Sequence, residues 1–230
     1  VICVRTLGAL VPRTVGRPIP GVEVMIGNDN FEPLENQHEK GRIYVRSKIV
    51  MQGYYKMPEV TAKVIKNGWL DTGDLGRFTL NGNLQIVGRA KETIVLTGGE
   101  NIEPVPIEDK ILESELIQSV MLVGQDRKYL AALVIPNEAA LKEWAENVGL
   151  QTEDYEALCS SDEVNEELLS EIRAKVNMKN GFKACEAVKY VVVISKPFEV
   201  GDELTNSLKM KRNHIADKYA DKIEEAFMKG

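Results

Sequence analysis

The stretch GWLDTGDLGRFTLNGNLQIVGR (residues 68–89) decides the fold of the first part of the chain. In its second half, two alternating runs flank Asn81-Gly82, a dipeptide that favours a hairpin turn because both residues tolerate a positive φ. We therefore predict two antiparallel strands joined at this turn. In its first half, Thr72-Gly73-Asp74 interrupts the apolar pattern. This tripeptide indicates either a turn in which Asp74 caps its own backbone or a carboxylate presented to a ligand.

The segments before this stretch also indicate strands, so residues 1–88 are expected to be β-rich. VEVMIG (22–27) and GRIYVRS (41–47) are predicted to be neighbouring strands, because short β-prone runs bounded by turn residues are typical of strands. Pro58 is typical of the first position of a helix and predicts a short one over 58–65. NGW (67–69) then turns the chain.

From about residue 89 strands and helices alternate, which indicates a domain of the α/β or α+β class. We expect helices packed on a short mixed sheet, and we place the two domains at 1–88 and 89–230, with the boundary near 88–92. The expected strands are 92–97, two within 119–136, and 187–195. The expected helices are 104–114, 137–149, parts of 151–180, and a long one from about 207 with Ile215, Tyr219, Ile223 and Phe227 on one face.

The composition narrows the class of protein. The 230 residues carry a net charge of −6, which argues against a general binder of nucleic acid or anionic membranes. Three distant cysteines indicate free thiols in a reducing compartment, and we expect a cytoplasmic protein with at most peripheral membrane association. Two histidines, His38 and His214, are expected to be surface residues and exclude a His-rich metal site. The chain starts on an apolar run without Met, as a piece of a longer protein would.

Three short motifs have both a functional and a purely structural interpretation. Asp74 could accept two hydrogen bonds from a vicinal diol such as ribose, or could cap an Asx turn. Arg89, at the end of the second hairpin strand, could contact sugar or phosphate oxygens, or could be a solvated strand end. Gly98-Gly99 could let a ligand approach the backbone closely, or could form a plain tight turn.

The motif LTNSLKMKR (204–212) places cations where a helix is expected to start. Thr205, Asn206 or Ser207 is predicted to be the N-cap, so Lys209, Lys211 and Arg212 would fall in the first turns of the helix. Cations are unfavourable at that positive end unless an anion such as phosphate binds there. The alternative is a tolerated, solvated basic end.

Taken in order, these stretches resemble one family, the AMP-forming acyl-activating enzymes. The resemblance is carried by GRPIPGVEVMI (16–26), GRIYVRSKIVMQGYYKMPEVT (41–61), GWLDTGDLG (68–76) and GRAKETIVLTGGENIEPVPIE (88–108). LTNSLKMKR resembles the family's C-terminal lysine motif in the form seen in long-chain fatty acyl-CoA synthetases. The family's usual glycine before that lysine is replaced by Leu208 here. The family's phosphate loop and its Mg²⁺-binding Glu motif would lie upstream of this chain.

The resemblance implies a role for each matching residue. Asp74 would accept the ribose hydroxyls of ATP or AMP, and Arg89 would contact the same sugar. Lys91 would be the hinge on which a small mobile C-terminal domain rotates against the large adenylating domain. Lys209 would bridge the carboxylate and the α-phosphate during adenylation, and Gly98 and Gly99 would line the path of the pantetheine arm.

The implied activity is that of a long-chain fatty acid–CoA ligase, an acid–thiol ligase that forms acyl-AMP and then acyl-CoA. The implied ligands are ATP, a fatty acid and CoA, with Mg²⁺ held by residues outside this chain. The remaining partner is the N-terminal domain of the same enzyme, so the fragment alone is expected to be inactive. Two alternatives stay open: another adenylate-forming ligase, for acyl-carrier protein or aryl-CoA, or a non-catalytic binding module.

Overall fold

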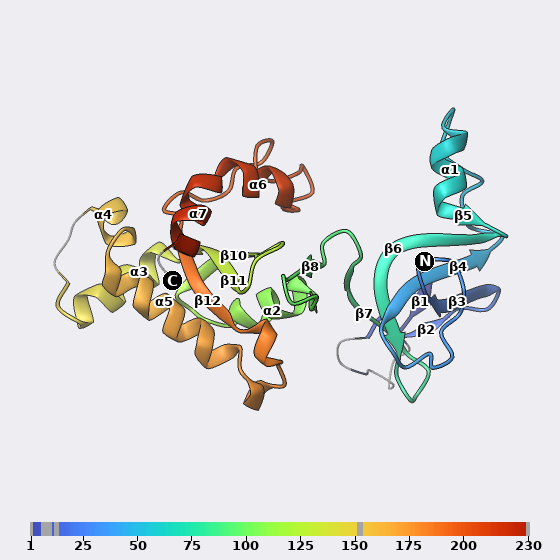
Figure 1. Ribbon diagram of the computed structural model, residues 1–230, viewed down its shortest axis with the longest axis horizontal. Coiled ribbons are helices and arrows are strands. Elements are labelled where there is room, and N and C mark those ends of the chain that lie inside the picture. The colour runs from blue at the N-terminus through green and yellow to red at the C-terminus, as the bar shows by residue number, and fades with distance from the viewer. Residues whose placement is uncertain (1, 6–10, 12–13, 151–153, 229–230) are drawn as a thin grey trace. The chain divides into compact units, whose positions relative to one another are not determined.

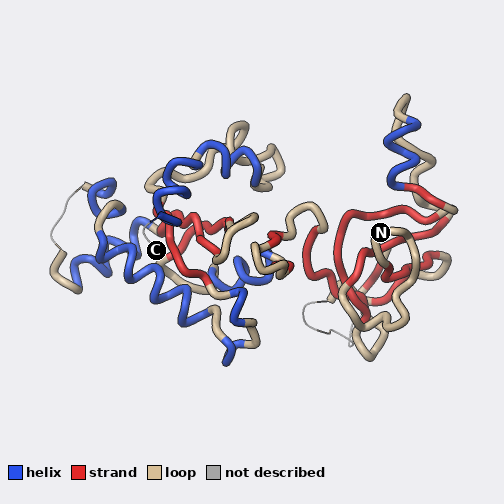
Figure 2. The backbone as a smooth tube through the Cα atoms, in the orientation of Figure 1, coloured by secondary structure: helices blue, strands red, loops and turns tan. Residues whose placement is uncertain are grey.

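The computed structural model describes residues 2–5, 11, 14–150 and 154–228, which form two compact units, Val1–Thr93 and Ile94–Gly230 (Figure 1). The helices and strands of both units are distinguished by colour in Figure 2. The expected division into part of a large domain and a mobile small domain remains a prediction.

The first unit is built on an antiparallel sheet. Its strands are β3 (Val22–Gly27), β4 (Gly41–Ser47), β5 (Ile65–Lys66), β6 (Trp69–Phe78) and β7 (Leu84–Arg89), in the order β3-β4-β6-β5 with β7 also paired to β6. β1 (Cys3–Val4) and β2 (Arg17–Pro18) form a separate pair, and α1 (Pro58–Val64) precedes β5. Apolar side chains of β3, β4 and β7 make the core: Val22, Ile26, Ile43, Val45 and Leu84. The predicted β3–β4 pairing and the Pro-started helix are confirmed.

The β6–β7 hairpin is confirmed, but its predicted two-residue turn is wrong. Residues 79–83 separate the strands, and Gly82 has a positive φ, at +71°. Thr79 organises this longer loop: its carbonyl accepts from Gly82 N at 2.8 Å, and its hydroxyl accepts from Asn83 N at 3.1 Å. The positive-φ pair occurs instead at Asn67 and Gly68, which join β5 to β6 with φ values of 51° and 78°.

The second unit is built on a three-stranded mixed sheet, as predicted. β10 (Ile117–Val123) pairs antiparallel with β11 (Leu130–Pro136), and β11 pairs parallel with β12 (Val188–Val193). A separate pair of strands, β8 (Ile94–Val95) and β9 (Asn101–Ile102), precedes the first helix of this unit. The expected strand over 92–97 is therefore confined to two residues. The helices are α2 (Pro104–Ile111), α3 (Glu138–Asn147), α4 (Tyr155–Cys159), α5 (Asp162–Lys175), α6 (Arg212–Lys218) and α7 (Ala220–Met228), with short 3₁₀ turns η1 (Met178–Asn180) and η2 (Ala184–Glu186).

Helices cover both faces of this sheet, which explains why β11 is buried throughout. On one face, Ala132 and Val134 pack in a cluster with residues of α2, α3 and α5. On the other face, Leu133 and Ile135 pack with residues of α6 and α7. Alternate side chains of a strand point to opposite faces, so one central strand serves both clusters. The mixed α/β fold class is confirmed.

The predicted long terminal helix is wrong in its start and its continuity. It begins at Arg212, not near 207, and it is divided at Tyr219 into α6 and α7. Residues before Arg212 form a turn closed by Thr205 and by Leu208, whose φ is +60°. The predicted apolar face is confirmed: Ile215, Tyr219, Ile223 and Phe227 all belong to the second cluster.

Cys3, Cys159 and Cys185 are free thiols. Within the described parts of the chain, every helix is too short or too polar to span a bilayer. Both histidines are exposed, as expected.

Candidate active site

A bulge in β6 lies next to Asp74, on a strand that pairs with β4 on one side and with β7 on the other. Tyr44 pairs with Asp71, while Arg42, two residues earlier on β4, pairs with Leu75, four residues later on β6. The additional residues on β6 are accommodated by Gly73, whose φ of +75° suits a residue without a Cβ atom. The bulge therefore interrupts the pairing of the Thr72-Gly73-Asp74 segment with β4, while Asp74 stays paired with β7.

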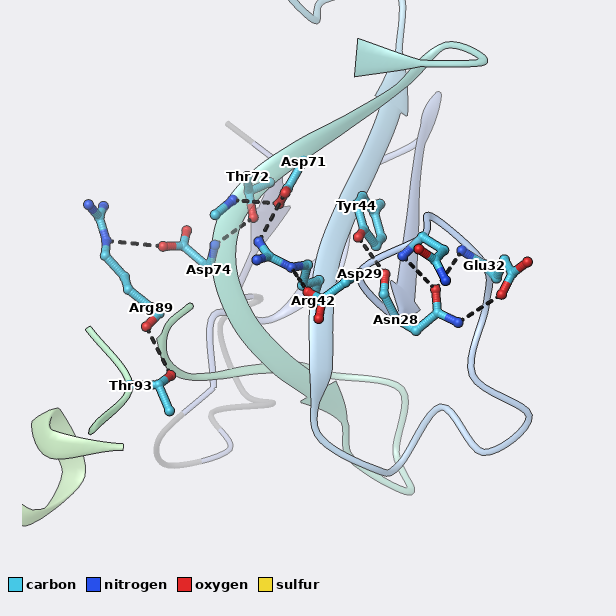
Figure 3. A network of polar contacts seen from close by, with 12 residues as sticks. Asn28, Asp29, Glu32, Arg42, Tyr44, Asp71, Thr72, Asp74, Arg89 and Thr93 are labelled. Carbon is cyan, nitrogen blue, oxygen red and sulfur yellow. Dashed lines mark hydrogen bonds and ion pairs between the residues drawn. The ribbon is translucent and has the colours of Figure 1, made fainter. Parts of the chain in front are cut away.

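Side chains next to Asp74 hold the bulge in shape (Figure 3). Asp71 Oδ1 accepts from Gly73 N at 2.8 Å, which makes the Asx turn that sequence analysis considered for Asp74. Thr72 Oγ1 accepts from Asp74 N at 3.1 Å and donates to Ile43 O at 2.8 Å. The neighbours of Asp74 thus fix its backbone.

A second layer of contacts anchors Asp71. Arg42 Nη1 donates to Asp71 Oδ2 at 3.0 Å, and Arg42 Nε pairs with Asp29. Burial lowers the pKa of Arg42, but the bond to Asp29 and the charge of Asp71 raise that pKa by more, so the cation is stabilised. Tyr44 donates to Asn28 O at 2.5 Å, and burial together with the Asp71 charge raises the pKa of Tyr44 to about 12.

Asp74 and Arg89 are brought together directly. They are opposite each other across β6 and β7, and Asp74 Oδ1 lies 3.2 Å from Arg89 Nε. The side chain of Asp74 is 27% exposed and that of Arg89 is 56% exposed. An ion pair this exposed contributes at most about 1 kcal/mol to the free energy of unfolding. Breaking the pair so that Asp74 can accept hydrogen bonds from a ligand's hydroxyl groups therefore costs little free energy.

Lys91 lies in the turn that follows β7. Glu92 N donates to Arg89 O at 2.9 Å, and Ala90 N donates to Gly73 O at 3.0 Å, so the backbone is fixed up to this turn. Lys91 is exposed and lies two residues before the end of the first compact unit at Thr93.

Gly98 and Gly99 lie at the tip of the loop between β8 and β9, in the second unit. Leu96 N donates to Glu100 O at 3.0 Å, and Gly99 N donates to Leu96 O at 2.8 Å. Gly99 has a φ of +84°, and both glycines are exposed. The loop is a tight turn in which the space beside Gly99 is open, whereas the Glu100 carboxylate lies over Gly98.

Lys209 lies outside the terminal helix, in a turn of its own, so its predicted place in the first turns of that helix is wrong. Lys211, at the N-cap, and Arg212, the first helical residue, do lie at the helix N-terminus. Leu208 N donates to Thr205 O at 2.9 Å, Thr205 N donates to Lys209 O at 2.9 Å, and Lys209 N donates to Thr205 Oγ1 at 3.1 Å. Thr205 closes this turn rather than capping the helix. The Lys209 side chain is exposed, whereas Lys211 Nζ donates to Gly201 O at 2.8 Å.

Sequence analysis missed the partner of Arg212. Its guanidinium forms a two-bond pair with Glu108, with Nη1–Oε1 at 2.8 Å, and Glu108 Oε1 also accepts from Leu122 N at 2.7 Å. The Glu108 side chain is 5% exposed, and the pair joins α2, which follows the glycine loop, to α6, which follows Lys209. A signal was present, because Glu108 shares the apolar face of α2 with Ile107 and Ile111. An acidic residue on a buried face requires a partner.

The described residues offer no metal centre: among them, no group of three or more His, Cys, Asp or Glu side chains is arranged to hold an ion.

Comparisons with known proteins identify a family whose members match most of the chain. The profile of the AMP-binding enzyme C-terminal domain matches residues 91–230. Long chain acyl-CoA synthetase 1 of Arabidopsis thaliana is 34% identical over 221 residues, which are 94% of this chain and 33% of that protein. The chloroplastic long-chain-fatty-acid–[acyl-carrier-protein] ligase AEE15 of the same plant is 33% identical over 239 residues, covering 99% of this chain and 31% of that protein.

A solved structure shares the fold. The A domain of a carboxylic acid reductase from Segniliparus rugosus, in complex with AMP and a co-purified carboxylic acid, has a TM-score of 0.74 at 21% identity. The match covers 94% of this chain and 33% of that one. The chain thus spans about a third of the length of the curated relatives that it matches.

Proposed function

This chain belongs to the AMP-binding, adenylate-forming enzyme family, and we propose that it is the C-terminal part of a long-chain fatty acid–CoA ligase. The observation that carries the proposal is the Asp74–Arg89 pair, a carboxylate and a guanidinium 3.2 Å apart on a bulge that neighbouring side chains fix. Names of relatives at 31–34% identity support the long-chain fatty acid as substrate.

In the proposed first step, the fatty carboxylate attacks the α-phosphate of ATP and pyrophosphate leaves. Asp74 accepts hydrogen bonds from the ribose hydroxyls, and Arg89 binds the same sugar. Lys209 stands where the carboxylate meets the α-phosphate and offsets the charge that the two anions concentrate there. Loss of a positioned group of this kind lowers a rate by about 10²–10³-fold.

In the proposed second step, the CoA thiol attacks the acyl carbon and AMP leaves. The ammonium of Lys209 has no role in this step, so rotation about Lys91 would remove it and deliver the backbone of Gly98 and Gly99. A backbone without side chains leaves room for the thin pantetheine arm. Domain and loop movements of this kind accompany the reaction steps of many enzymes.

Mg²⁺ would neutralise phosphate charge in the first step. The described residues do not supply a ligand set for it, so its ligands would come from the upstream part of the enzyme. The roles proposed for this chain are binding the nucleoside and moving the lysine.

A second candidate differs in the acceptor. The relative named as an acyl-carrier-protein ligase covers 99% of this chain, so transfer to a carrier-protein thiol is the alternative. Both candidates use the same adenylation step.

One experiment separates the candidates. The longer polypeptide that carries this chain is incubated with ATP, Mg²⁺ and palmitate, and either CoA or a pantetheinylated carrier protein is supplied. We expect AMP and acyl-CoA in equal amounts with CoA, and little product with the carrier protein. The reverse preference would support the alternative, and no AMP with either acceptor would refute both.

A further inference from the structure

A buried carboxylate lies at the base of the turn that carries Lys209. Glu203 is 2% exposed, although it belongs to a segment that is otherwise largely at the surface. Its Oε1 accepts from Lys218 Nζ at 2.6 Å and from Tyr219 Oη at 3.2 Å, and its Oε2 accepts from Glu199 N at 3.0 Å. A buried charge is tolerated when it is paired and hydrogen-bonded, and Glu203 meets both conditions.

The backbone of the same residue closes the turn. We call residues 203–211 the Lys209 turn. Lys211 N donates to Glu203 O at 2.8 Å, and Leu204 pairs with Met210 in an isolated bridge. Lys209 lies inside this closed segment, so its backbone position is set by the two residues that meet at the base.

The carboxylate of Glu203 links this base to the next element. Lys218 and Tyr219 lie at the end of α6, and α6 begins directly after the Lys209 turn. The bonds from Glu203 to these two side chains therefore connect the first residue of the Lys209 turn to the end of α6, the helix that follows the turn. Burial raises the pKa of Glu203, but its bonds to Lys218 and to Glu199 N lower that pKa by more, so the carboxylate stays charged at neutral pH.

We propose that Glu203 is the positioning residue of the Lys209 turn, and that its bond to Lys218 fixes where the Lys209 ammonium stands. The proposal rests on the adenylation role given above to Lys209. Glu203 itself does not touch substrate. Its effect passes through the backbone, so it belongs to the adenylation step, in which Lys209 is in place.

The first test measures the turn itself. In the full 230-residue chain, amide hydrogen exchange of Thr205, Lys209 and Lys211 is followed by NMR at pH 7. Glu203→Gln is expected to accelerate exchange at these amides by about tenfold or more, because loss of a charged partner costs about 1.5–3 kcal/mol. The matched control is Glu138→Gln, which removes an exposed Glu–Lys bond of the same 2.6 Å length on α3 and should leave these amides unchanged.

A second pair of variants covers the case in which Glu203→Gln does not fold. Lys218→Met removes the cation, whereas Lys218→Arg keeps it. Faster exchange in the first variant and near-normal exchange in the second support the proposal. Normal exchange in Lys218→Met, or in a folded Glu203→Gln, would overturn it.

The second test measures the two half-reactions in the longer ligase. Glu203→Gln is expected to lower kcat of ATP–pyrophosphate exchange by about 10–10²-fold, the effect of misplacing a reacting group by about 1 Å, with KM for ATP within about twofold. Thioester formation from supplied acyl-adenylate should be unchanged. Equal loss of both half-reactions, or no loss, would overturn the positioning role. If the unaltered ligase forms no adenylate, the proposed function fails, and the exchange data alone decide whether Glu203 orders the turn.

Discussion

Asp74 and Arg89 are opposite each other across β6 and β7, and their side chains approach to 3.2 Å where β7 ends. Because the pair is partly exposed, Asp74→Asn should change the free energy of unfolding by less than about 1 kcal/mol. Because each charge-assisted bond to a ribose hydroxyl is worth about 1.5–3 kcal/mol, it should weaken ATP binding by about 10–10²-fold. Urea titration and nucleotide binding to the longer ligase check both parts. Asp109→Asn, at an exposed position of α2, is the matched control. Unchanged ATP binding in Asp74→Asn would contradict the ribose role.

Leu208 directly precedes Lys209 and adopts a left-handed conformation, with φ at +60°. This conformation costs about 1–2 kcal/mol for a residue with a Cβ atom and almost nothing for glycine. The Leu208 side chain is 70% exposed, so little packing is lost by removing it. Leu208→Gly should therefore raise the free energy of unfolding by about 0.5–1 kcal/mol, measured from urea midpoints. Leu208→Ala retains the strained backbone and should show no gain; a gain as large as that of glycine would contradict the explanation.

The buried Glu108–Arg212 pair should be costly to break. Removing one member leaves the other charge buried without its partner, so Glu108→Gln should lower the free energy of unfolding by about 3–5 kcal/mol. Glu224→Gln is the matched control, because it breaks an Arg–Glu pair in the same unit whose side chains are 40% and 43% exposed. That variant should lose no more than about 1 kcal/mol. Equal losses in the two variants would mean that burial does not determine how much an ion pair contributes to the free energy of unfolding.

Stability should fall in acid through Asp202. Hydrogen bonds from Lys218 and His214 lower the pKa of Asp202 to about 2, below its usual value of 3.8. A carboxyl group with a lowered folded-state pKa adds stability above its unfolded pKa, and that stability is lost as the pH falls through the folded pKa. Urea midpoints should therefore decrease between about pH 4 and pH 2, and Asp202→Asn should reduce this decrease. An identical acid profile in the variant would contradict the assignment.

The spacing of apolar residues and the positions of prolines were sufficient to predict most helices and strands. The β3–β4 pair, the Pro-started helices α1 and α2, and the mixed sheet of the second unit follow from local patterns that each element carries in its own sequence. The apolar face of the terminal helices was also readable, because Ile215 and Ile223 repeat at helical spacing. Such patterns are local, so one sequence reveals them.

The errors came from competing side-chain bonds and from distant partners. Thr205 was one of three residues predicted as the N-cap, yet its hydroxyl closes the Lys209 turn and the helix starts seven residues later. Thr79 similarly lengthened a hairpin that Asn81-Gly82 alone would have made short. Arg212 finds its partner 104 residues away, and no local pattern specifies such a pairing.

The candidate site was predicted in part. Asp74 and Arg89 were each singled out as candidates, but their pairing was not predicted, because it depends on a register shift of the β6–β7 ladder between Leu75 and Gly76. The role of Asp71 in the Asx turn was not foreseen either. Asp71 lies two residues before Gly73 and Asp74 directly after it, and the Gly73 N–H donates to the carboxylate of Asp71. Glu203 was also missed, because its burial depends on α6 folding back over it.

The most direct test of the account is to separate the half-reactions in the longer ligase that carries Lys209→Ala. Adenylation is followed by ATP–pyrophosphate exchange with palmitate, and thioester formation by acyl-CoA produced from supplied acyl-adenylate and CoA. The account predicts that exchange falls by about 10²–10³-fold, as expected for loss of a group that offsets charge in the transition state, while thioester formation proceeds at the rate of the unaltered enzyme. Equal loss of both half-reactions, or normal exchange, would contradict it.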